Sequence, residues 1–185
     1  MQLRSFVAVL LVLTASAAGS AAAQSGGVGV SSVRGITLGV GVAASGIDAE
    51  GAHFDPHNGG GLSVTLGYGV GEAVTLFARG SAAYQHAHYD AGARYSFGGT
   101  QFRLRPYVEG AFTYTASRER TLDVRGPALT AGAGLEYFLA RHVSLDAGFS
   151  YVQGRYTAGE GTREIPDLGE AFRSGRFTVG LKLRP

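Results

Sequence analysis

Large apolar residues alternate with small or polar residues through most of this chain, with a period of two. Leu62, Val64 and Leu66, for example, are separated by Ser63 and Thr65. Successive side chains of a β-strand point to opposite faces, so this period predicts strands rather than helices. Eight segments share the pattern: Ile36–Ala43, Leu62–Gly69, Val74–Ala82, Tyr89–Phe97, Tyr107–Tyr114, Leu129–Tyr137, Val143–Tyr151 and Arg176–Leu183. Each is about as long as a tilted strand that crosses a bilayer, which needs roughly ten residues.

The connections between these segments alternate between short and long. Short connections are expected at Val70–Glu72, Gly98–Arg103 and Ala140–His142. Longer polar connections are expected at Ser45–Gly60 and Gln153–Phe172, with one of intermediate length at Ala116–Pro127. Gln85–His88 is the exception, because it is predicted to be a short turn on the long-loop side. Short turns on one rim and longer loops on the other are typical of membrane barrels.

The composition of the two strand faces indicates which face points outward. Gly, Ser, Thr and Ala dominate the second face, and these residues are small enough for the crowded interior of an eight-stranded barrel. Charged residues make up only 16% of the chain, whereas a water-exposed surface carries many more. Aromatic residues gather near the segment ends, as expected for rings at lipid headgroup level. They are Tyr68, Phe97 and Tyr137 on one rim and Tyr84, Tyr89, Tyr114 and Tyr151 on the other.

We therefore predict an all-β fold: a closed, antiparallel, up-and-down transmembrane β-barrel of about eight strands. Closure removes the sheet edges that lipid could not satisfy. The alternative is a soluble periplasmic barrel or sandwich with a ligand in its core. An even number of strands places both ends of the barrel on the rim with the short turns, which would face the periplasm.

The first residues are typical of a secretory signal peptide. Arg4 is followed by the apolar run Phe6–Leu13 and by small residues that end in Ala21–Ala23. The apolar run is shorter than the roughly 20 residues of a membrane-spanning helix. We expect a signal peptide at 1–23, an N-terminal segment at 24–33 and a barrel domain at 34–185. A buried N-terminal helix is the alternative for the first segment.

On these features the chain resembles the OmpA/OmpX-type small barrels of the outer membrane. The resemblance rests on the signal peptide, the alternating segments, the stretch Leu104–Tyr114 and the final segment Phe177–Leu183. It implies a monomer in the bacterial outer membrane, in contact with outer-membrane lipid and lipopolysaccharide and inserted by the barrel assembly machinery. One departure is that such proteins usually end on an aromatic residue, whereas this chain ends in Leu183, Arg184 and Pro185.

Charged residues on the inward face form the candidate site. They are Arg79, Asp90, Arg94, Glu109, Glu136, Asp146, Arg176 and Lys182. The four positive and four negative charges balance, and charges removed from water must pair or stay hydrated. The turn at Gln85–His88 would place Arg79 beside Arg94, and the next hairpin would place Arg94 beside Glu109. Glu109 is then the carboxylate that both arginines share.

This lumen charge network has two interpretations. It is either a self-neutralising plug that fixes the register of the strands, or the gate of a narrow channel for small or apolar solutes. Eight strands enclose room for side chains but no open pore, so passive diffusion of large solutes is not expected. The plug favours a structural or surface-interaction protein of the cell envelope.

Histidines near the loop rim raise the question of a metal site. His53, Asp55 and His57 lie in the first long connection, and His86 and His88 lie in the predicted turn. Imidazole and carboxylate groups at such spacings are ligands of Zn²⁺ or Cu²⁺. No ordered scaffold for them is evident, so we expect no metal and no other cofactor.

Catalysis and nucleic-acid binding are also not expected. His142 and Ser144 suggest the histidine–serine pair of lipid A deacylases, but lipid A occupies the other leaflet and Ser144 is predicted to face inward. A lipid-modifying enzyme is the least favoured alternative. Lys182 is the only lysine and there is no basic run, so nothing indicates nucleic-acid binding.

Overall fold

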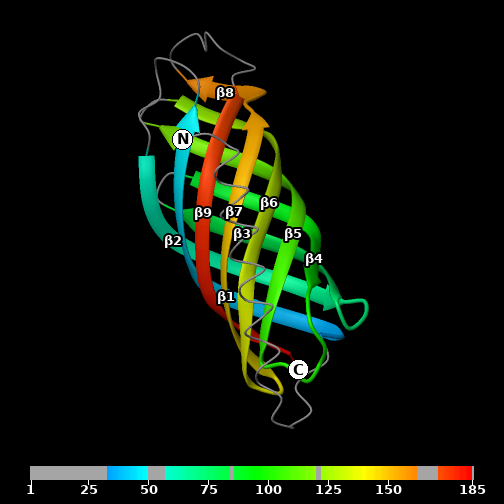
Figure 1. Ribbon diagram of the computed structural model, residues 1–185. Helices are drawn as coiled ribbons and strands as arrows, with labels where there is room; N and C mark the ends of the chain where they lie inside the picture. Colours follow the sequence, from blue (N-terminus) through cyan, green and yellow to red (C-terminus); the bar gives the residue numbers. More distant parts are fainter. Residues whose placement is uncertain (1–32, 50–56, 84–85, 120–121, 162–170, 185) are drawn as a thin grey trace, which may run out of the picture.

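The computed structural model describes residues 33–49, 57–83, 86–119, 122–161 and 171–184. These residues form β1 (Gly35–Ala49), β2 (His57–Gly69), β3 (Val74–Ala83), β4 (His86–Ser96), β5 (Leu104–Glu119), β6 (Leu122–Ala140), β7 (Val143–Arg155), β8 (Ala158–Gly161) and β9 (Ala171–Leu183). Eight of the nine strands are antiparallel neighbours in a ring that runs β1 to β7 and then β9 (Figure 1). Pairing of β9 with β1 and of β5 with β6 closes the ring. The predicted fold class, a closed antiparallel barrel, is confirmed.

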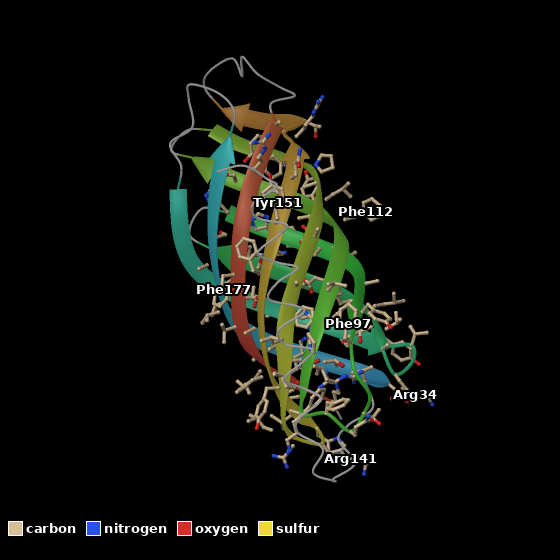
Figure 2. All side chains as sticks on the ribbon, viewed as in Figure 1. Arg34, Phe97, Phe112, Arg141, Tyr151 and Phe177 are labelled. Carbon is tan, nitrogen blue, oxygen red and sulfur yellow. The ribbon has the colours of Figure 1, made fainter. Side chains whose placement is uncertain are left out.

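The alternating pattern gives the barrel an apolar outer surface. Val64 is 59% exposed and Phe112 is 77% exposed, whereas the inward Arg79 is only 6% exposed. Figure 2 shows the ring of Phe112 projecting away from the barrel wall. In water such a surface would be unfavourable by roughly 25 cal/mol per Å² of apolar area. The arrangement therefore suits a barrel surrounded by acyl chains, as in membrane barrels.

Exposed aromatic residues lie toward both ends of the apolar surface. Tyr68 and Tyr137 lie near the rim with the short turns, and both are exposed. Toward the other rim, Tyr89 of β4 and Tyr114 of β5 are direct cross-strand partners, and both are exposed. Rings at these two levels match the headgroup regions of a bilayer.

Three short connections lie on one rim, at 70–73, 97–103 and 141–142. The barrel also begins and ends there, because Gly35 pairs with Gly69 and Leu183 pairs with Val143. Figure 2 shows Arg34 and Arg141 toward this end of the barrel, and Figure 1 shows β8 at the opposite end. The predicted division into a short-turn rim and a second rim therefore holds.

Several predicted connections are shorter than expected. The prediction for Ala116–Pro127 was wrong, because β5 and β6 continue as a paired hairpin up to Glu119 and Leu122. The predicted turn at Gln85–His88 was also wrong, because Ala83 pairs with His86. Polar residues continue these strands because cross-strand pairing, rather than apolar character, satisfies their backbone groups.

The two long connections are likewise reduced by strand pairing. β1 runs on to Ala49 and β2 begins at His57, within the predicted connection Ser45–Gly60. Within Gln153–Phe172, β7 reaches Arg155, and the short strand β8 pairs with β6. The β5–β6 hairpin and β8 together form an extension beyond the barrel wall.

The predicted signal peptide at 1–23, and the segment 24–33 except Val33, lie outside the described residues. Within the described part of the chain, no helix is long and apolar enough to cross a membrane.

Candidate functional site

All eight charged residues predicted for the lumen lie inside the barrel and are buried. Their exposed fractions range from 0% for Arg176 to 8% for Glu109 and Asp146. Each points inward because it lies an even number of positions along its strand from small residues that line the lumen, and such residues share one face. The charges come from six strands, β3 to β7 and β9, so the site links most of the ring.

Strand register sets which of these residues are direct neighbours. Arg94 pairs with Glu109 across β4 and β5, as predicted. The prediction that Arg79 lies beside Arg94 was wrong, because Arg79 pairs with Asp90 and Arg94 pairs with Thr75. The hairpin is tighter than expected, which shifts β4 along β3 and replaces an arginine pair with an ion pair.

Glu109 bridges the two arginines. Nη2 of Arg79 donates to Oε1 of Glu109 at 2.7 Å, and Nη2 of Arg94 donates to Oε2 at 2.8 Å. Asp90 is a second branch point, with Arg79 Nε at 2.8 Å, Arg176 Nη2 at 2.6 Å and Thr113 Oγ1 at 2.9 Å. Charge-assisted hydrogen bonds of this kind are shorter and stronger than neutral ones.

Asp146 extends the network toward the short-turn rim. Its Oδ2 accepts from Arg94 Nη1 and from Lys182 Nζ, both at 2.6 Å, and its Oδ1 accepts from the Tyr107 hydroxyl at 3.2 Å. The Arg94 guanidinium also lies 3.5 Å from the centroid of the Tyr107 ring. This is a cation–π contact in a water-poor interior, where such contacts are strongest. The result is one continuous chain of ion pairs from Arg176 to Lys182.

Two buried cations were missed by the sequence reasoning. Arg184 donates through Nη2 to Glu136 Oε1 and through Nη1 to Ser144 Oγ, the latter at 3.0 Å. Arg105 donates through Nη2 to the backbone carbonyls of Glu72 and Gly98, at 2.7 and 3.2 Å. The alternation of faces along a strand would have identified both as inward residues. Arg184 follows the inward Lys182 by two positions, and Arg105 precedes the inward Tyr107 by two.

The predicted charge balance of the lumen was therefore wrong. Among the described residues, six cations and four carboxylates are buried, which leaves an excess of two positive charges. Both added cations lie toward the short-turn rim, where Glu136 is the nearby carboxylate. Arg105 donates hydrogen bonds to two backbone carbonyl oxygens, and these bonds stabilise its buried charge in place of a second carboxylate.

The side of the lumen formed by β1 and β9 is lined with glycines. A cavity of about 20 Å³ lies there beside Lys182, Asp146 and Arg79. A single water molecule needs at least about 10–15 Å³ on the same measure, so the cavity has room for about one. The charged side chains that border this small space come from β3, β7 and β9.

His86 and His88 lie in β4 and face the lumen, not in a surface turn as predicted. Nδ1 of His86 is 2.8 Å from Ser117 Oγ, and Nδ1 of His88 is 3.1 Å from Thr115 Oγ1. His53 and Asp55 lie outside the described residues, and His57 begins β2. Where the structure describes side chains, no three His, Asp or Glu residues are grouped to hold a metal.

The pair His142 and Ser144 is not arranged as a nucleophile and its base. Ser144 is fully buried, and its Oγ donates to Glu136 Oε1 at 2.6 Å. Nδ1 of His142 lies 2.7 Å from the backbone carbonyl oxygen of Arg184. A catalytic pair needs the base within hydrogen-bond reach of the nucleophile, whereas here both groups are engaged elsewhere.

The barrel is similar to several solved outer-membrane proteins. Neisserial surface protein A matches with a TM-score of 0.61 and 16% identity over 81% of this chain and 97% of that one. OprG from Pseudomonas aeruginosa matches with a TM-score of 0.55 and 14% identity over 83% and 97%. Ail, the attachment invasion locus protein of Yersinia pestis, matches with a TM-score of 0.50 and 15% identity over 81% and 98%.

No protein-family model matches the sequence, and no curated protein matches it. At the identities found among solved structures, the likeness concerns the fold. The chain thus has the fold of the small outer-membrane β-barrels.

Proposed function

We propose that this chain is an integral outer-membrane protein with a structural or surface-interaction role in the bacterial envelope. Its short turns face the periplasm, and the β5–β6 hairpin faces the outside. The apolar belt between two levels of aromatic residues supports insertion in a bilayer. We expect a monomer that the barrel assembly machinery inserts and that outer-membrane lipid and lipopolysaccharide surround.

The observation that carries this proposal is the filled lumen. Ten buried charged side chains occupy it. The ion pairs Arg79–Glu109, Arg94–Asp146 and Arg176–Asp90 each link strands that are not neighbours in the ring, and Arg176–Asp90 spans the lumen from β9 to β4. Separating a buried ion pair leaves uncompensated charges, at a cost of about 3–5 kcal/mol. Opening a path for solutes would require several ion pairs to separate at once. The filled lumen therefore favours a plug over the gate of a channel.

The extension beyond the wall supports a role at the cell surface. Five residue pairs follow Tyr114 in the β5–β6 hairpin, up to Glu119 and Leu122. At about 3.3 Å per residue this adds roughly 16 Å of paired strand. Two of the similar structures are described as a surface protein and an attachment invasion locus protein. We propose a comparable display of polar strands and loops here.

Conductance across a planar lipid bilayer tests the proposal. We expect no stable current steps from the purified barrel at moderate voltage, because buried, ion-paired side chains fill the lumen. A pore-forming outer-membrane porin in the same bilayers is the positive control. Reproducible single-channel steps would instead support the alternative, a narrow channel gated by the lumen charge network.

A further inference from the structure

Two buried arginines at the short-turn end of the lumen have nitrogen atoms that no hydrogen bond satisfies. Both hydrogen bonds of Arg105 come from the same nitrogen, Nη2. Its Nε and Nη1, and the Nε of Arg184, are buried and have no hydrogen-bond partner in the part of the chain that the structure describes. The two residues are only 1% and 6% exposed. A buried donor without an acceptor is unfavourable, so these three nitrogens are available to an acceptor from outside the chain.

Arg105 also has no counter-charge of its own. Glu136 is its direct cross-strand partner, but Oε1 of Glu136 accepts from Arg184 and from Ser144. Lys182 Nζ lies 4.0 Å from the same oxygen. Among the described side chains, no carboxylate forms an ion pair with Arg105. The excess positive charge of the lumen is therefore concentrated at the short-turn end.

Arg103 continues this group of arginines to the solvent. Its carbonyl accepts from the amide of Phe138, one step beyond the pairing of β5 with β6. Phe138 is buried, and its ring centroid lies 4.9 Å from the Arg184 guanidinium. Because opposite residues of paired strands share a face, Arg103 lies on the lumen side. It is exposed, and no ion pair or hydrogen bond joins its side chain to a described residue. Arg103, Arg105 and Arg184 form what we call the mouth cluster.

The connection that covers Arg105 allows one acceptor to be exchanged for another. The carbonyl of Gly98, in the connection 97–103, accepts from Nη2 at 3.2 Å. A hydrogen bond to a neutral carbonyl is weaker than one to an oxyanion. Nη2 forms one edge of the guanidinium with Nε and the other edge with Nη1. An oxyanion that enters past Arg103 and replaces the Gly98 carbonyl therefore gains a second bond, from a nitrogen that is otherwise unsatisfied.

We propose that the mouth cluster binds a phosphate group. Two phosphate oxygens accept from one edge of the Arg105 guanidinium, and a third accepts from Nε of Arg184. Arg103 supplies positive charge at the entrance. A phosphate group carries between one and two negative charges at neutral pH, and the buried lumen has an excess of two positive charges. The inference rests on the fold and not on the proposed surface role, and the chemistry is the same for free phosphate and for a lipid headgroup.

Phosphorus NMR of inorganic phosphate tests the inference, with the purified barrel in maltoside micelles that contain no phosphate. We expect the original chain to broaden the phosphate resonance in a saturable way. Arg105→Gln should bind phosphate about tenfold more weakly, because it removes charge-assisted hydrogen bonds. Arg105→Lys keeps the charge but not the planar edge, so it should also bind more weakly. Arg103→Gln should bind roughly threefold more weakly, because it removes one exposed charge.

Arg34→Gln is the matched control. Arg34 is an exposed arginine at the same end of the barrel (Figure 2), but it is ion-paired with Glu72. This variant should bind phosphate as the original chain does. Equal binding by the original chain and Arg105→Gln would overturn the inference. Displacement of the phosphate by sodium chloride of the same ionic strength would do so as well, because a buried site is screened only weakly.

Phosphatidylglycerol added to the same micelles distinguishes the two sources of phosphate. If it displaces inorganic phosphate from the original chain, or if only its own resonance responds to Arg105, a lipid headgroup supplies the phosphate. If inorganic phosphate stays bound, the site takes the free ion. If neither resonance responds to the barrel in a way that depends on Arg105, the inference is wrong.

Heat-modifiable migration on a gel shows whether each variant folds, since a folded barrel migrates differently before and after boiling. Arg105→Gln should fold, because it removes a buried charge that has no carboxylate partner. If it does not fold, Arg103→Gln decides the question, because this substitution changes an exposed side chain. Phosphate binding by folded Arg103→Gln that equals that of the original chain would then overturn the inference.

Discussion

Arg94 and Glu109 face each other across β4 and β5, and both Nε and Nη2 of Arg94 donate to the same oxygen of Glu109, at 3.2 and 2.8 Å. The other oxygen of Glu109 accepts from Arg79. One carboxylate thus holds two guanidinium groups in the centre of the lumen. The stability of the barrel should depend on this carboxylate more than on any surface ion pair.

Glu109→Gln should lower the free energy of unfolding by about 3 kcal/mol, because it leaves two buried arginines without their shared counter-charge. Urea unfolding in lipid vesicles measures the change. The control is Glu72→Gln, since the Arg34–Glu72 pair at 3.2 Å is exposed, and such pairs contribute less than about 1 kcal/mol. Equal effects of the two substitutions would show that the lumen network does not stabilise the barrel.

Gly148 provides space for the Tyr107 hydroxyl. A Cβ added at Gly148 would overlap that hydroxyl, while its other neighbours would be no closer than 3.4 Å. Gly148→Ala should therefore destabilise the barrel by about 2 kcal/mol through overpacking. In a Tyr107→Phe background the cost should fall below about 1 kcal/mol, because the overlapping atom is gone.

Gly80→Ala is the matched control for this pair, since an added Cβ there meets nothing within 4 Å. Its cost should be the same with and without the Tyr107 hydroxyl. A Gly148→Ala cost that persists in the Tyr107→Phe background would contradict the packing described for the lumen.

Val64→Arg should strongly impair insertion, because Val64 points into the middle of the apolar belt. An arginine at the bilayer midplane costs about 2–4 kcal/mol, whereas near an interface it costs about 0–1 kcal/mol. Val70→Arg, in the β2–β3 turn, should therefore be tolerated. Folding yield into vesicles, scored by heat-modifiable migration, compares the two. A tolerated Val64→Arg would argue that β2 does not face lipid.

Lipid A should keep its acyl chains in the presence of this protein. Ser144 is buried and hydrogen-bonded to Glu136, so it has no access to a lipid ester. Mass spectrometry of lipid A from cells that produce the original chain or Ser144→Ala should give identical spectra. Loss of an acyl chain that requires Ser144 would establish the enzymatic alternative.

Strand positions and faces were accessible from sequence because alternation with a period of two is a local property. Val64 faces outward and Thr65 inward whichever strand pairs with β2. Register is different, because it depends on where a hairpin turns. The prediction placed a turn over His86 and His88, whereas these residues continue the inward alternation of β4 up to its pairing with Ala83. The error exchanged the neighbours of Arg79.

The buried residues that the sequence analysis did not place in the lumen were also missed for physical reasons. Pro106 interrupts the alternating pattern before Tyr107, which hid the inward position of Arg105. Arg184 follows the last alternating segment and was not counted with Lys182. The ion pair between Arg94 of β4 and Asp146 of β7 depends on the registers of three successive strand pairs, and no single segment shows it. A site shared between strands becomes visible only when the pairing is known.

The inside-out arrangement of β2 tests the central claim most directly, and the chain has no cysteine to interfere with labelling. Spin labels on single cysteines at positions 62–67, reconstituted in vesicles, would report collisions with dissolved oxygen and with a water-soluble nickel complex. We expect oxygen collisions to peak at positions 62, 64 and 66 and to be low at 63, 65 and 67. Strong nickel collisions at 62, 64 and 66, with no alternation in oxygen, would show that this face meets water and would contradict a membrane barrel.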